Sequence, residues 1–120
     1  MNHIDLGDKG EYAAVKYLGS IGYTIITTKY RTKIGEIDII AKDKDCIVFV
    51  EVKTRRSIIY GYPAEAVNRK KQHKIINTAL CFLNQHGLLD AACRFDILEV
   101  HISQSQDAAR LNHIINAFGS

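Results

Sequence analysis

Hydrophobic residues recur along the chain with two periods, and each period predicts one kind of element. Apolar residues three or four positions apart, such as Ala14, Leu18 and Ile21, indicate amphipathic helices. Runs of β-branched and aromatic residues between turns rich in Gly, Asp, Lys and Thr indicate strands. The expected elements are a helix Leu6–Ser20, strands Tyr23–Tyr30, Glu36–Ala41 and Cys46–Thr54, a helix that starts after the N-cap residue Asn68 and runs to His86, and strands Cys93–Ile102 and Arg110–Ile115. The order αβββαββ predicts an α/β fold.

The third expected strand carries the most informative charges. Its segment Ile47–Val52 is almost wholly apolar before Glu51, as in a strand covered on both faces. Successive side chains alternate faces, so Glu51 and Lys53 share one.

Asp38 lies on the preceding strand. Alternation there predicts that Glu36, Asp38 and Ile40 share one face while Ile37 and Ile39 share the other. A hairpin turn over Lys42–Asp45 would make the two strands antiparallel neighbours, so that their charged ends meet at one sheet edge.

Converging carboxylates at that edge would suit Mg²⁺ or Mn²⁺, since hard divalent cations prefer oxygen ligands and can bridge to a phosphate. Such a site favours phosphodiester hydrolysis, with the ammonium of Lys53 orienting the attacking water. An alternative stays open, because Glu51 and Lys53 on one strand face also suit a solvated surface or a structural ion pair.

The string GEIDIIA, VFVEVKTR, GYPAEAV and RFDI resembles the YraN-like branch of the PD-(D/E)xK nuclease superfamily. The likeness runs nearly end to end and includes the opening GDKGEYAAVKYL, the strand GYTIITTKYR and the closing HIINAF. Ile37 stands where the superfamily motif has proline, a change that suits a strand.

The resemblance implies a restriction-endonuclease-like three-layer fold around a mixed central sheet. It also implies that Asp38 and Glu51 bind Mg²⁺ or Mn²⁺ and that Lys53 is the catalytic lysine. Glu11 would be the additional acid that resolvase-like members carry on the first helix. From the residues alone, Glu11 is equally explained as an acid near a helix N-terminus.

The formal charge of +3 is modest, but basic residues gather beside the expected site. Arg31 precedes the Asp38 strand, Arg55 follows Glu51, and Lys71 lies in a basic run that opens the second helix. Cations close to carboxylates suit a phosphodiester substrate, so these three residues are expected to bind nucleic acid, with DNA as the expected partner. For the rest of the basic run a solvated helix face is an equal alternative, whereas Lys71 also matches a lysine of the family pattern.

Length and composition limit the number of domains, the cellular location and the metal or disulfide sites to be expected. The chain has 120 residues, 47% of them hydrophobic, which suits a single domain over 1–120. No apolar run approaches a membrane span and the polar start lacks a signal-peptide core, so a cytoplasmic protein with no membrane partner is expected. The three cysteines and five histidines show no spacing typical of zinc sites or disulfide frameworks.

Two further features accompany the expected site. The segment Arg56–Val67, with Gly61 and Pro63, interrupts the periodicity and is expected to be a loop that carries substrate contacts. Arg94 and Asp96, two apart on a strand, are expected to form a structural pair.

The expected function is a metal-dependent nuclease acting on DNA, including branched or damaged DNA. A homodimer fits this expectation, because many nucleases that cut both strands work as dimers. The alternative is a nucleic-acid-binding module in DNA repair, recombination or uptake that does not cleave. A protein-interaction scaffold is a third class, and salt dependence of DNA binding separates it from the other two.

Overall fold

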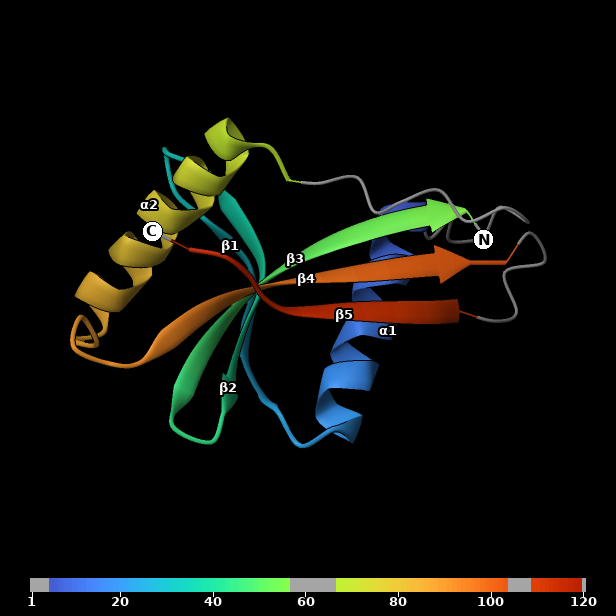
Figure 1. Cartoon of the computed structure of the whole chain (residues 1–120), viewed down its shortest axis with the longest axis horizontal. Coiled ribbons are helices and arrows are strands. Elements are labelled where there is room, and N and C mark those ends of the chain that lie inside the picture. Colours follow the sequence, from blue (N-terminus) through green and yellow to red (C-terminus); the bar gives the residue numbers. More distant parts are fainter. Residues whose placement is uncertain (1–4, 57–66, 104–108, 120) are drawn as a thin grey trace.

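The computed structural model describes residues 5–56, 67–103 and 109–119. Within them, two helices and five strands follow the expected order (Figure 1). The elements are α1 (Leu6–Ser20), β1 (Thr24–Arg31), β2 (Glu36–Asp43), β3 (Cys46–Arg56), α2 (Arg69–Gln85), β4 (Cys93–Ile102) and β5 (Ala109–Phe118). Both helices begin where the sequence predicts, after the N-cap residues Asp5 and Asn68.

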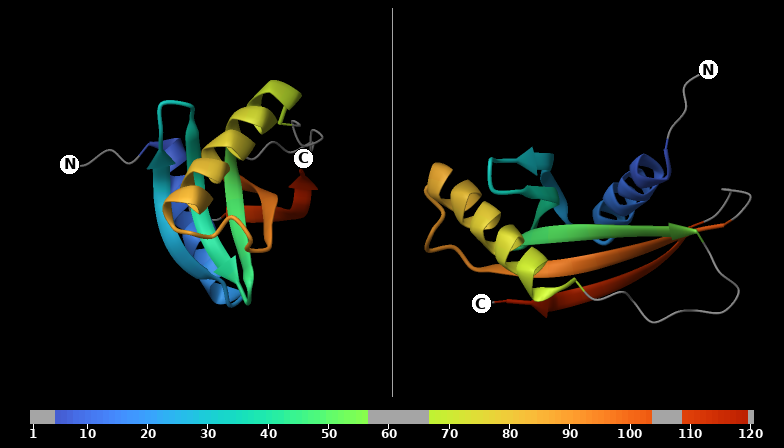
Figure 2. Two further views of the ribbon diagram at one scale, coloured as in Figure 1. Left: turned by 90° about the vertical axis from the view of Figure 1, so that its left-hand side faces the viewer. Right: turned by 90° about the horizontal axis from the view of Figure 1, so that it is seen from above.

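The strands form one mixed sheet in the order β1-β2-β3-β4-β5. β3 and β4 are parallel, and the other neighbouring pairs are antiparallel. The two helices pack on opposite faces of this sheet (Figure 2). The α/β class and the order αβββαββ are therefore confirmed, and the three layers agree with a restriction-endonuclease-like fold.

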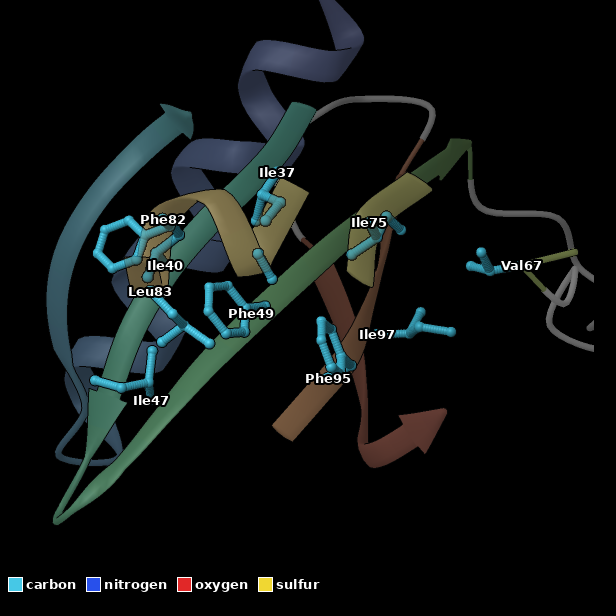
Figure 3. Close-up of a cluster of buried hydrophobic side chains, with 11 residues drawn as sticks. Ile37, Ile40, Ile47, Phe49, Val67, Ile75, Phe82, Leu83, Phe95 and Ile97 are labelled. Atoms are coloured by element: carbon cyan, nitrogen blue, oxygen red, sulfur yellow. The ribbon is translucent and has the colours of Figure 1, made fainter. Parts of the chain in front are cut away.

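The α2 side of the sheet is closed by an aromatic core. Phe49 of β3 stacks on Phe95 of β4, with ring centroids 5.3 Å apart, and meets Phe82 of α2 edge-to-face at 6.1 Å (Figure 3). All three rings are buried. Because such rings each bury about 150–250 Å² of surface, this cluster fixes β3 firmly against α2. The candidate residues Glu51 and Lys53 follow directly on the same strand.

The hairpin between β2 and β3 is tighter than expected. Asp43 pairs with Cys46, so the turn consists of Lys44 and Asp45 alone and not of Lys42–Asp45. Lys44 adopts a left-handed backbone with φ of 55°. β2 therefore extends two residues beyond Ala41, the end predicted for that strand.

The predicted alternation along β2 is wrong at its N-terminal end. Ile37 and Ile40 pack on the α2 side of the sheet, whereas Ile39 and Ala41 pack on the α1 side. Pairing with β3 begins only at Ile39, opposite Val50. Asp38 therefore lies where the two strands part, and this local irregularity breaks the period of two.

On its other side, β2 faces a second irregularity. The pairs Thr28↔Ile39 and Tyr30↔Ile37 place Lys29 opposite Asp38, and Lys29 has a φ of 53°. A left-handed residue in a strand bends the backbone locally.

No helix in the described part of the chain is long and apolar enough to span a membrane.

Candidate active site

The site lies at the fork where β2 leaves β3. Beyond Val50 the backbone of β3 has no β2 partner, and the Asp38 carboxylate takes its place: Oδ2 accepts a hydrogen bond of 2.8 Å from the Val52 amide. Burial, followed by repulsion from Glu51, raises the pKa of Asp38 to about 7. Two acids from neighbouring strands are thus held close together in a poorly hydrated position.

Glu51 is buried and faces α2, where it meets a lysine. The Lys71 ammonium lies 2.8 Å from its Oε1, and the Lys71 side chain is 46% exposed. The hydrogen bond to Glu51 raises the pKa of Lys71. The ion pair ties the first turn of α2 to the end of β3, and its cation lies directly on the candidate carboxylate.

Lys53 shares this face, as alternation predicts. Burial, then the neighbouring Lys71 charge, lowers its pKa, although Glu51 acts in the opposite direction. The pKa of Lys71 is raised by its contact with Glu51, whereas the pKa of Lys53 is lowered. Lys53 is therefore the amine that loses its proton more readily.

The other face of the fork opens into a pocket beside α1. Its volume is about 350 Å³, and its lining includes Glu11, Arg31, Glu36 and Asp38. Burial, opposed by Lys29, raises the pKa of Glu11. The predicted first-helix acid thus lines the same pocket as Asp38.

α1 can approach this closely because of Gly10. A Cβ at that position would overlap the side chain of Thr54 on β3. The glycine therefore sets the distance of Glu11 from the sheet by its lack of a side chain. Its φ is not positive, so backbone conformation does not require glycine here.

The predicted nucleic-acid contacts lie around these acids in different settings. Arg31 lines the Asp38 pocket and pairs with Glu36 at 3.1 Å. Arg55 is exposed on β3 and donates a hydrogen bond of 3.1 Å to the Thr54 carbonyl oxygen. The expected loop at Arg56–Val67 falls on 57–66, which lie outside the described residues, so its substrate contacts stay a prediction.

The carboxylates of the site suit a hard divalent cation that takes only a few of its ligands from protein side chains. Among the described residues, no group of three or more His, Cys, Asp and Glu side chains is arranged to hold a metal ion. Mg²⁺ commonly takes only one or two carboxylates and completes its shell with water and substrate phosphate. Asp38 and Glu51 are two such carboxylates, and a cation would offset both the burial of the Asp38 charge and its repulsion by Glu51, the two main causes of its raised pKa.

A second polar cluster lies near the C-terminal end of α1, and the sequence predicts only one of its pairs. Asp96 is fully buried and accepts hydrogen bonds from Arg94 at 3.0 Å and from the Asn116 amide at 2.9 Å, while His113 Nε2 lies 2.7 Å from it. The expected Arg94–Asp96 pair is confirmed. The role of His113 was missed, since nothing local in the sequence signals a contact 17 residues away. Tyr17 contacts the other ring nitrogen of His113 at 3.2 Å, so the cluster joins α1, β4 and β5.

These features coincide with a family relationship across most of the chain. Residues 10–100 match the Uncharacterised protein family UPF0102, to which the chain belongs. A UPF0102 protein of Clostridioides difficile is 49% identical over 118 residues, covering 98% of this chain and all of the relative. Proteins of the same name from Clostridium acetobutylicum and Geobacter sulfurreducens are 48% and 47% identical, covering 93% and 94% of this chain and 92% and 88% of the relatives. The YraN-like resemblance is confirmed by these matches.

Proposed function

We propose that this protein is a metal-dependent nuclease that hydrolyses phosphodiester bonds of DNA in the cytoplasm, with branched or damaged DNA among its substrates. The observation that carries the proposal is the convergence of Asp38 and Glu51 at the strand fork, with Lys53 beside them. Two close carboxylates with a partly buried amine are an unfavourable arrangement for stability alone, which supports a chemical role.

In this proposal, Asp38 and Glu51 would hold Mg²⁺ or Mn²⁺, and Glu11 would extend the donor set from α1. A bound divalent cation supplies Lewis-acid polarisation of the phosphate and acidifies a water. Lys53, whose pKa is lowered by burial, can accept a hydrogen bond from the attacking water and orient it. Lys71 stands next to Glu51 and can transfer its contact to a phosphate oxygen when substrate arrives.

The charge distribution supports a nucleic-acid substrate. The first turns of α2, where Lys71 contacts Glu51, carry three further exposed cations: Arg69, Lys70 and Lys74. The positive end of the helix dipole points the same way. Phosphate-driven binding should weaken steeply with added salt, because bound counterions are released on association.

The second candidate function is a nucleic-acid-binding module that does not cleave, in DNA repair, recombination or uptake. The ion pair between Lys71 and Glu51 favours it, since a buried acid with a fixed cationic partner can be purely structural. Both candidates predict salt-sensitive DNA binding, and only the nuclease predicts metal-dependent cutting.

The deciding experiment is cleavage of labelled single-stranded, duplex, flap and four-way-junction DNA with Mg²⁺ or Mn²⁺. Wild type is compared with Glu51→Gln and Lys53→Gln, each shown to be folded by circular dichroism. Asp45→Asn and Lys42→Gln, at the far hairpin, remove the same charges outside the site.

Cutting that requires metal, disappears in both site variants and persists in both hairpin variants would support the nuclease. Salt-sensitive binding of all five proteins without cutting would favour the binding module. If both strands of a duplex are cut together, sedimentation should reveal a homodimer, because the described part of one chain offers one such site.

A further inference from the structure

A groove runs along the surface between α1 and the edge strand β1. Its volume is about 590 Å³, and its lining includes Glu11, Tyr12, Val15, Lys16, Thr28 and Lys29. We call it the α1–β1 groove. Pockets that bind organic ligands have volumes of about 300–1,000 Å³, so the groove is large enough for a nucleobase with its sugar.

The groove joins the candidate active site. Asp8, Glu11 and Lys29 line both the groove and the pocket that contains Asp38. Lys29 is held in place by an ion pair of 3.2 Å to Asp8. A ligand lying along α1 would therefore end in the pocket lined by Glu11 and Asp38.

Helical periodicity places an aromatic ring and a cation in this groove. Ala14 and Leu18 are buried against the sheet, which leaves Tyr12 and Lys16, one turn apart, on the exposed side of α1. Tyr12 is 58% exposed, and the Lys16 ammonium lies 5.6 Å from its ring centroid. Tyr12 therefore offers an exposed aromatic surface, with a cation beside it, next to the proposed active site.

We propose that the α1–β1 groove binds an unpaired nucleotide of the strand that is cut, with its base stacked on Tyr12 and a neighbouring phosphate contacted by Lys16. The inference rests on the proposed function and specifies its substrate as DNA with a single-stranded segment beside the cut. Aromatic rings with nearby cations are the usual platform for unpaired strands. A base in an intact duplex cannot reach such a ring unless it leaves the stack.

The groove can be tested directly because the chain contains no tryptophan. Tyr12→Trp therefore places a single indole in the groove. We expect its emission to be quenched by a 20-nucleotide oligo(dT), and much less by a blunt 20-bp duplex, in EDTA so that nothing is cut.

Binding of the two labelled DNAs to other variants is then measured by fluorescence anisotropy. Tyr12→Ala should weaken oligo(dT) binding roughly 5- to 150-fold, the effect of removing one base–aromatic stack worth about 1–3 kcal/mol. Duplex binding should change less than twofold. Tyr12→Phe should retain the affinity, and Lys16→Gln should reduce the salt dependence. Controls outside the groove are Ile115→Ala, an equally exposed apolar residue on β5, and Lys42→Gln on β2.

The outcomes separate this inference from the proposed function. DNA binding with unchanged indole emission, or an equal loss for oligo(dT) and duplex in Tyr12→Ala, would overturn the groove and leave the nuclease proposal standing. If neither DNA bound to wild type, the nucleic-acid function would fail and the groove inference with it. Quenching by oligo(dT), lost affinity in Tyr12→Ala and retained affinity in Tyr12→Phe would together establish the stacking site.

Discussion

Replacing Asp38 by Asn should stabilise the metal-free protein at neutral pH. The pKa of Asp38 rises from 3.8 to about 7 in the folded chain, first because of burial and then because of Glu51. The Asn side chain keeps an oxygen that can accept the 2.8 Å hydrogen bond from the Val52 amide. The substitution therefore removes the costly charge and retains the contact.

The pH dependence follows from proton linkage. Below about pH 3.8, Asp38 is protonated in both folded and unfolded chains. The contribution of this group to the free energy of unfolding is then at its full value. As pH rises towards and through about 7, the unfolded chain releases the proton first, and this stability is lost. The rise in the pKa of Asp38 from 3.8 to about 7 corresponds to a loss of at most about 4 kcal/mol in the free energy of unfolding, at about 1.36 kcal/mol for each pH unit.

We expect Asp38→Asn to raise the free energy of unfolding by about 2–4 kcal/mol at pH 8 and by less than about 0.5 kcal/mol near pH 4. Urea unfolding with EDTA at both pH values measures this. Added Mg²⁺ should stabilise wild type at pH 8 and leave the variant unchanged, since a ligand of the folded state alone stabilises it. Destabilisation of the variant at pH 8 would refute the reasoning and make Asp38 a structural residue.

Four other substitutions test packing and charge pairing, at the site and in the Asp96 cluster. Gly10→Ala should cost about 1–3 kcal/mol because its methyl group overlaps Thr54, whereas Gly19→Ala, with open space around it, should stabilise α1 by about 0.5–1 kcal/mol; thermal unfolding of both compares them. Asp96→Asn should cost about 3–5 kcal/mol in urea unfolding and leave the cleavage rate of the folded protein unchanged. Lys71→Met should cost only about 1 kcal/mol in the same assay, because the lysine is half exposed, yet weaken DNA binding at low salt.

The local elements could be predicted because their signals span only a few residues. The N-cap at Asn68, the apolar stripes and the shared face of Glu51 and Lys53 all depend on neighbours within one or two turns or pleats. The face of Asp38 could not be predicted in this way. It depends on where β2 parts from β3, which is set by packing against two different helices.

The sequence by itself therefore determined the element order, the family and the types of residue available for chemistry. Tertiary structure alone decided which of them meet. Lys71 reaches Glu51, and Glu11 shares a pocket with Asp38, although each pair is far apart along the chain. Such encounters arise from burying apolar faces of helices and sheet against one another, and periodicity within one element carries no information about which residues of another element will lie opposite. The groove beside Tyr12 exists for the same reason, since it forms only when α1 packs beside β1.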